Sequence, residues 1–357
     1  MIRCVPCILL ISLSFPAKAQ DRQALEGFIT EAMIGSNVPG LSIAVIEHGE
    51  IAWERGFGVK NTASGEKVDP NTVFEAASLS KPIFAYAVLK LVDRGVIDLD
   101  VPLFQYVPGY IDDPRIRTVT ARQVLSHTSG LPNWRPRDKP LAFAFEPVTR
   151  FSYSGEGFVY LQTVVEHLAG MPLDAFVRNE VFQPLGMTNS SYVWRDSYER
   201  LAATGHQSNG DPVPKYKPVE GGSPINGGGG PSAASSLHST ATDYAKFMLA
   251  LMKGSAMLTT QVHVDASCAN CVGKPVTHPS ESISWGLGVG LEQTPQGIAF
   301  WPWGENSYFR CFQIGLPKEG RGVVIFTNSE NGFKAIPKIV DRTMDQSQPA
   351  FDWLHYR

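Results

Sequence analysis

The sequence predicts an α/β fold in which strands from both ends of the chain share one sheet and a mostly helical lobe lies between them. Three observations lead to this prediction. Apolar, β-branched runs lie near the amino-terminal end, similar runs return near the carboxyl-terminal end, and helical patterns dominate the residues between. Strands first and last, with helices inserted, favour a single sheet built by both ends.

The composition is that of a globular protein. The 357 residues are 43% hydrophobic and 18% charged, which is enough apolar material for a sizeable core and excludes a largely disordered chain. The formal net charge is -3, so no global basic field attracts nucleic acid, and we expect no nucleic-acid partner.

The first nineteen residues have the pattern of a signal peptide. Arg3 gives a basic start, residues 8–15 form an apolar run, and Ala17-Lys18-Ala19 has small residues where signal peptidase reads. A buried N-terminal strand is the alternative, but the order of these features favours a signal. We expect cleavage near Ala19, a single mature domain over residues 20–357 and a periplasmic or secreted location. No later stretch is apolar enough for a membrane helix, so no stable membrane insertion is expected.

The elements at the start of the mature chain follow from their periodicity. Residues 22–34 carry apolar side chains on one side of a helix. Residues 41–47 and 51–57 are β-branched runs joined by a short polar turn, which predicts a hairpin. Residues 80–94 predict a helix that ends before Gly95.

The rest of the chain divides into a helical middle and a return to strands. The helical lobe covers approximately residues 80–280. After the helix over 80–94, helices are expected at 121–126, 157–169, 173–182 and 242–252, and an irregular stretch at 205–236 separates the last two. Strands are expected at 285–291, 298–301, 307–316 and 322–328, followed by a helix at 333–344.

Three cysteines remain once the expected signal is removed. They are Cys268, Cys271 and Cys311. The first two form a CxxC in a polar stretch, where an oxidising compartment permits a disulfide. A zinc site would add His263 and His278, but their spacing matches no standard site. Cys311 lies in an apolar strand pattern and is expected to be a buried thiol. We expect no metal and no cofactor.

The motif Ser78-Leu-Ser-Lys81 is the first with chemical content. Positions i and i+3 share a helix face, so Lys81 can point its amine at the Ser78 hydroxyl, which is a weak nucleophile without a base. The helix start adds backbone N–H groups near a developing oxyanion. Alone the motif is weak, because a Ser and a Lys three residues apart occur by chance in many proteins, and a capping serine followed by a solvated lysine is then the favoured interpretation.

Two later motifs add to it. Tyr153-Ser-Gly155 lies in a loop before a helix, where a phenol can share protons with a Ser–Lys pair, although a packed aromatic is the alternative. An aromatic-rich run over residues 301–311 leads into a strand, and its alternative is an aromatic edge strand.

Taken together and in order, these motifs resemble the serine β-lactamase-like superfamily, which includes class C β-lactamases, penicillin-binding DD-peptidases, D-aminopeptidases and related esterases. The similarity runs over residues 41–328. The matching pieces are Ser78-Leu-Ser-Lys81, Leu125-Ser-His-Thr-Ser-Gly-Leu-Pro132, Tyr153-Ser-Gly155, Pro184-Leu-Gly-Met-Thr188, Ser239-Thr-Ala-Thr-Asp-Tyr244 and Trp285-Gly-Leu-Gly288. The resemblance implies a β-lactamase/transpeptidase-like fold, with an antiparallel sheet flanked by helices, a mostly helical lobe and the site in a cleft.

The resemblance also implies roles for individual residues. Ser78 would be the acylated nucleophile and Lys81 the group that takes its proton. Tyr153 would assist as a base and then protonate the leaving group. The oxyanion hole would be the backbone N–H groups of Ser78 and Asn306. We interpret His127, which matches a motif position, as a structural, turn-forming histidine.

Two departures from the family pattern concern substrate binding. The middle motif usually ends in Asn, and here that position is Gly155. The third motif, on the strand beside the site, would be Trp303-Gly304-Glu305, where lactamases and peptidases usually begin with Lys or His. An indole cannot pair with a substrate carboxylate, and Glu305 would tend to repel one. Arg310, in the strand expected over residues 307–316, is the candidate for restoring a positive charge.

These residues predict a hydrolase that needs no metal and acts through a serine acyl-enzyme. We expect an ester or neutral amide as substrate. The alternatives are a weak β-lactamase or a DD-carboxypeptidase or D-aminopeptidase, so the partners expected are small esters, amides, β-lactams or short peptides. A non-catalytic binder of cell-wall fragments or drugs is a third hypothesis, against which the retention of Ser78, Lys81 and Tyr153 argues. A zinc hydrolase is least supported, because the chain has no HExxH.

Overall fold

The computed structural model describes residues 15–136, 138–225, 228–265 and 279–357. The Cys268–Cys271 pair, His278 and most of the expected signal lie outside these residues. Within them, no helix is both long and apolar enough to cross a membrane.

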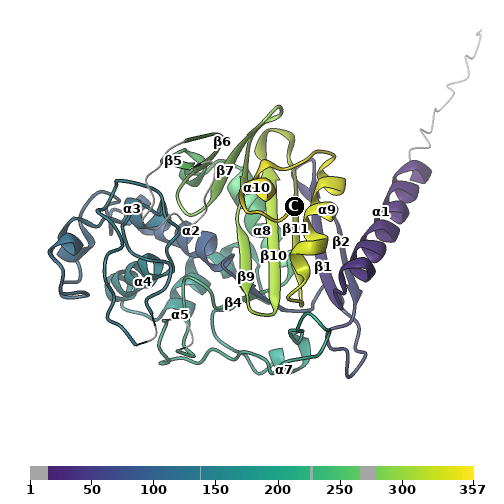
Figure 1. The fold of residues 1–357 in the computed structure, drawn as a ribbon, viewed down its shortest axis with the longest axis horizontal. Helices are drawn as coiled ribbons and strands as arrows, with labels where there is room; N and C mark the ends of the chain where they lie inside the picture. Colours follow the sequence, from purple (N-terminus) through teal and green to yellow (C-terminus); the bar gives the residue numbers. More distant parts are fainter. Residues whose placement is uncertain (1–14, 137, 226–227, 266–278) are drawn as a thin grey trace, which may run out of the picture.

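In the described part of the chain, nine strands form one antiparallel sheet (Figure 1). They are β1 (Gly40–Glu47), β2 (Glu50–Gly58), β5 (Val262–Asp265), β6 (Pro279–Trp285), β7 (Gly290–Thr294), β8 (Gly297–Trp301), β9 (Trp303–Asn306), β10 (Phe309–Leu316) and β11 (Arg321–Thr327). The order is β2-β1-β11-β10-β8-β7-β6-β5, and β9 also pairs with β10. Pairing of β1 with β11, which runs from Leu41 opposite Thr327 to Ile46 opposite Gly322, confirms that both ends of the chain build the sheet.

The helices cover both faces of this sheet and form a lobe beside it. They are α1 (Phe15–Ser36), α2 (Ser80–Asp93), α3 (Ala121–Leu125), α4 (Gly155–Ala169), α5 (Leu173–Val177), α6 (Gln183–Leu185), α7 (Tyr198–Leu201), α8 (Ala241–Met252), α9 (Gly332–Met344) and α10 (Pro349–Trp353). Figure 1 shows the lobe of α2 to α5 on the left and α1 on the right.

Strand β1 is covered on both faces, which explains its nearly continuous apolar sequence. Ile43 and Val45 belong to the core that includes α1 and α9, whereas Ala44 and Ile46 belong to the core that includes α8. Because successive side chains of a strand point to opposite faces, a strand covered on both faces buries every residue.

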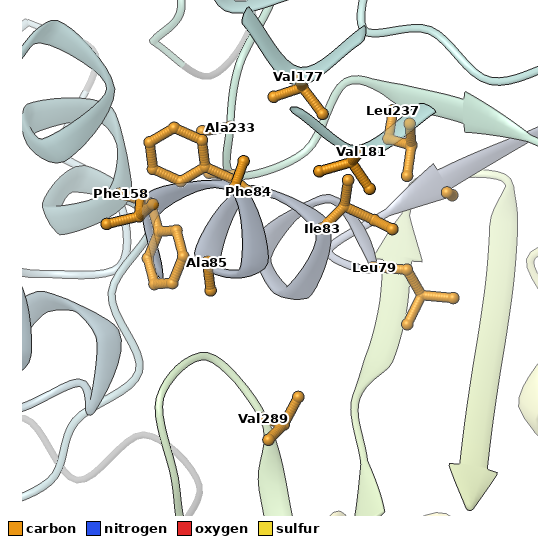
Figure 2. Packing of buried hydrophobic residues seen from close by; sticks show 14 of the residues in the cluster. Leu79, Ile83, Phe84, Ala85, Phe158, Val177, Val181, Ala233, Leu237 and Val289 are labelled. Atoms are coloured by element: carbon orange, nitrogen blue, oxygen red, sulfur yellow. The ribbon is translucent and has the colours of Figure 1, made fainter. Parts of the chain in front are cut away.

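Helix α2 is the central helix of the larger core, and it fixes the position of the residues that precede it. Ten of its fourteen residues are buried. Figure 2 shows this packing, in which Ile83 and Phe84 lie among side chains from the lobe, and Ala85 faces the segment that carries Val289. A helix so enclosed holds its first turn in one place.

Some expected elements differ from the structure. The strand expected over residues 285–291 is wrong, because a turn at residues 286–289 separates β6 from β7. A Cβ on Gly286 would lie 2.0 Å from the Met257 carbonyl oxygen, and Gly288 has a φ of +86°, so this apolar stretch turns where a strand would run straight. The expected helix over 173–182 changes to a π-helical turn at Arg178–Phe182.

Candidate active site

Ser78 lies in the turn between β3 (Phe74–Ala77) and α2, and this turn is firmly held. Ala77 before it has a φ of +49°, a strained conformation for a residue with a side chain. The Ser80 hydroxyl donates to the Ala77 carbonyl at 2.5 Å and accepts from the Leu237 N–H at 2.9 Å. The Tyr192 hydroxyl donates to the Ser80 carbonyl at 2.6 Å. These bonds tie β3, α2 and the chain near β4 (Leu237–Ser239) around the serine.

Lys81 is the residue closest to the requirements of a base for Ser78. Its amine nitrogen lies 3.2 Å from the Ser78 hydroxyl oxygen and 2.8 Å from the Ala234 carbonyl oxygen. The side chain is 2% exposed, and this burial lowers the pKa of Lys81 to about 7. An amine with such a pKa is about half unprotonated at neutral pH, so it can accept a proton.

Tyr153 completes the group around Ser78. Its hydroxyl is hydrogen-bonded with Ser78, and the Lys81 amine lies 4.7 Å from the centre of its ring. Burial raises the pKa of Tyr153 far above its ordinary value, with the Ser78 hydrogen bond opposing the shift in part. The phenol therefore keeps its proton at neutral pH and is better suited to donate a proton than to act as the first base.

His127 holds the Tyr153 segment in place, as expected of a structural residue. Its Nδ1 accepts from the Ser154 N–H at 3.0 Å, its carbonyl accepts from the Ser152 N–H at 2.8 Å, and its ring lies 4.3 Å from the Tyr153 ring. Burial, and secondarily the charge of Lys81, holds the pKa of His127 well below its ordinary value, so the imidazole is neutral.

The expected third motif lies on β9, next to the strand that leads to Ser78. A Cβ on Gly304 would lie 2.5 Å from the Ala76 carbonyl oxygen, so glycine allows β9 to approach β3. Two residues on, the Asn306 amide donates to the Glu75 carboxylate at 3.0 Å. Ser78 and Asn306 consequently line the same cavity.

Glu75 is a site residue that the sequence analysis missed. Burial raises the pKa of its carboxyl to about 7, while the hydrogen bond from Asn306 opposes this shift. A lone acid in an apolar strand, three residues before the Ser78 nucleophile candidate, was the signal that could have identified it.

The cavity in front of Ser78 has a volume of about 630 Å³. Its lining is rich in aromatic and small polar side chains. The lining residues are Glu75, Ser78, Asn133, Trp134, Tyr153, Val213, Pro214, Tyr216, Pro224, Ile225, Ser232, Ser235, Trp303, Glu305, Asn306, Ser307, Tyr308, Phe309, Leu354 and Tyr356. Among the described residues, no Lys, Arg or His contributes to this lining.

Arg310 is turned away from that cavity. Its guanidinium pairs with Glu305 at 3.1 Å and donates to the Asn306, Ser307 and Phe309 carbonyls at 2.5, 3.2 and 3.1 Å. The side chain therefore fastens the turn between β9 and β10 and balances the charge of Glu305.

The expected substrate-binding residues divide into two groups. Trp303 and Glu305 line the cavity, whereas Gly155 and Gly304 are places where two segments approach closely. Above Gly155, the ring of Trp134 occupies the space that a side chain would need.

Cys311 is a free, fully buried thiol on β10, as expected. Among the described residues, no three His, Cys, Asp or Glu side chains gather as a metal site would require.

The chain is similar to known proteins in sequence and in fold. The family model described as Beta-lactamase matches residues 25–341. The chain is 27% identical to "Esterase EstB" of Burkholderia gladioli, over 85% of this chain and 90% of that protein. Among solved structures, a class C beta-lactamase matches with a TM-score of 0.77 at 18% identity, covering 94% of this chain and 98% of that one. A D-alanine carboxypeptidase AmpC from Burkholderia cenocepacia matches with a TM-score of 0.76 at 18% identity, covering 92% and 99%. These two likenesses show the shared fold.

Proposed function

Since the chain belongs to the beta-lactamase family, we propose that it is a serine hydrolase whose Ser78 forms an acyl-enzyme with uncharged esters or amides. The observation that carries the proposal is the buried Lys81 amine, 3.2 Å from the Ser78 hydroxyl, with a pKa lowered to about 7. A nucleophile and an adjacent base of suitable pKa are the minimum that acyl transfer requires.

In the acylation half of the reaction, the unprotonated Lys81 amine takes the Ser78 proton as the serine oxygen attacks the substrate carbonyl carbon. The backbone N–H of Ser78 stabilises the resulting oxyanion. The Asn306 N–H, which was expected to be the second donor, faces Phe309 in the β9–β10 ladder. The bond to the leaving group breaks, and the Tyr153 phenol gives its proton to the departing oxygen or nitrogen. The Lys81 ammonium then returns a proton to Tyr153, so the net transfer is from Ser78 to the leaving group.

In the deacylation half, a water molecule attacks the acyl carbon and passes a proton through Tyr153 to Lys81. The bond between the acyl carbon and the Ser78 oxygen breaks, and Lys81 returns the proton to that oxygen. The acid product leaves, and all three residues recover their starting protonation states.

The charge of the cavity supports an uncharged substrate. A carboxylate beside Trp303 would lose hydration without gaining an ion pair, and removing a charge from water is costly when nothing replaces the water. The Arg310 guanidinium, which is occupied by Glu305 and three backbone carbonyls, supplies no such pair. The similarity to an esterase over most of both chains agrees with this preference.

The test is a comparison of kcat/KM for p-nitrophenyl acetate and benzylpenicillin with the purified chain, and with Ser78→Ala as the control. We expect the ester to be the better substrate and both activities to vanish in the control. A preference for benzylpenicillin would make β-lactamase the correct function. Stable labelling by penicillin without turnover of either compound would make the protein a binder.

A further inference from the structure

The segment after α9 returns to the active site. Helix α10 anchors it: the ring of Phe351 lies 4.4 Å from that of Phe312 on β10, and the Trp353 indole donates to the Asp265 carbonyl at 2.7 Å. Immediately after α10, Leu354 and Tyr356 line the cavity in front of Ser78.

Tyr356 is held there by two contacts. Its ring stacks on Phe333 of α9, with centroids 3.9 Å apart and planes at 14°, and its hydroxyl donates to the Glu305 carboxylate at 3.2 Å. Together with Arg310, this hydrogen bond offsets the charge of Glu305 on the cavity wall. The wall therefore presents apolar ring surface and a balanced carboxylate.

This wall is continuous with the catalytic group. Trp303 and Glu305 are two residues apart on β9, so their side chains lie on the same face of the strand. The Trp303 ring lies 4.7 Å from the Tyr153 ring, and Tyr356 is bonded to Glu305. The order along the wall is accordingly Tyr153, Trp303 and then Tyr356.

We infer that Trp303, Leu354 and Tyr356 form a subsite for an apolar, uncharged leaving group, such as an aromatic alcohol, with Tyr356 as its specificity-determining residue. The inference rests on the proposed function, in which Tyr153 protonates the leaving group. The departing oxygen must then lie beside the Tyr153 hydroxyl, and the rest of the alcohol extends along the adjoining wall. Ring surfaces favour such a group through apolar burial and stacking. Leu354 and Tyr356 lie beyond residue 341, where the matched family model ends.

Three esters separate the two ends of the substrate: ethyl acetate, 2-phenylethyl acetate with an enlarged alcohol, and ethyl phenylacetate with an enlarged acyl group. We expect Tyr356→Ala to lower the kcat/KM ratio of 2-phenylethyl acetate to ethyl acetate about tenfold, or about 1.4 kcal/mol. The ratio of ethyl phenylacetate to ethyl acetate should change less than about threefold, since the acyl group lies elsewhere. Tyr356→Phe keeps the ring and should retain most of the alcohol preference.

The matched control is His355→Asn, an exposed neighbour whose left-handed φ of 59° asparagine tolerates. Thermal unfolding checks each variant, and Tyr356→Leu replaces Tyr356→Ala if the latter does not fold. Fluorophosphonate labelling of wild-type Ser78 separates the two proposals. If Ser78 is labelled but Tyr356→Ala or Tyr356→Leu changes neither kcat/KM ratio, or changes both equally, the subsite is refuted and the proposed function stands. If Ser78 is not labelled, the proposed function is refuted, and the subsite inference that rests on it is refuted with it.

Discussion

Trp134 fills the space above Gly155: a Cβ on that glycine would lie 2.7 Å from the Trp134 ring and 2.8 Å from the Asn133 carbonyl oxygen. The Asn133 side chain in turn accepts from the Gly155 N–H at 3.0 Å. Trp134 and Asn133 thus leave room only for a glycine at this position, where the family motif usually has asparagine. The cavity there is lined by Trp134 and Asn133 from the preceding loop.

Gly155→Asn, which restores the usual family residue, should therefore destabilise the protein. We expect a loss of about 1–3 kcal/mol in the free energy of unfolding, the usual range for an overpacked site. Gly155→Asn combined with Trp134→Ala should lose less than the two single variants added together, because the second change opens the space. Urea unfolding measures this. Strict additivity, or a fully stable Gly155→Asn, would show that Trp134 does not fill that space.

The pH dependence of kcat/KM should follow the protonation of the Lys81 amine, the proposed base. Because Lys81 accepts the Ser78 proton only when it is unprotonated, kcat/KM for a neutral ester should fall as the pH drops below about 7. Below that pKa the loss should approach tenfold per pH unit. Glu75, whose pKa is also raised to about 7, is the competing explanation, and Glu75→Gln tests it. If the low-pH limb disappears in Glu75→Gln, the carboxyl and not the amine controls the profile.

Lys81 and Tyr153 should act as one unit. Lys81→Ala and Tyr153→Phe should each lower kcat by a large factor, and the double variant should be little worse than the poorer single one, since both serve one proton path through Ser78. Steady-state kinetics of the three variants decides this. Losses that multiply in the double variant would mean that one of the two residues is only structural.

Trp303 should control the preference for uncharged substrates. Trp303→Lys or Trp303→His should shift the kcat/KM ratio of benzylpenicillin to p-nitrophenyl acetate upward by about tenfold, or about 1.4 kcal/mol. The shift is expected to be partial, because a cation at this position shares its strand face with Glu305. Trp303→Phe is the matched control and should leave the ratio within about threefold. A ratio that does not move in either charged variant would place the substrate carboxylate elsewhere.

Local patterns made part of this structure predictable from the sequence. The hairpin of β1 and β2, helix α2 and helix α4 each carry their own periodicity over many residues. The positions of Ser78, Lys81 and Tyr153 near one another followed from a family resemblance, since 72 residues separate Lys81 from Tyr153 and no local pattern relates them.

Other features depend on distant contacts and gave no local signal. Strand β9 has only four residues, begins after a proline and contains a glycine, so its sequence carries no strand pattern. Gly304 is needed there because β9 approaches Ala76 closely, which is a contact between distant parts of the chain. The role of Tyr356 arises from Glu305, 51 residues earlier in the chain. Gly155 fits its position because the ring of Trp134 fills the space where a side chain would lie. The sequence alone could not place Trp134 above Gly155, so the missing asparagine could be interpreted there only as the loss of a polar contact.

The proposed role of Ser78 as the nucleophile can be tested by intact-mass measurement after treatment with a fluorophosphonate, followed by peptide mapping. We expect a single adduct, located on Ser78, in the wild-type protein. In folded Ser78→Ala we expect no adduct, together with a loss of ester turnover on the order of a thousandfold or more. An adduct on another residue, or ester turnover retained by a purified, folded Ser78→Ala protein, would contradict this role.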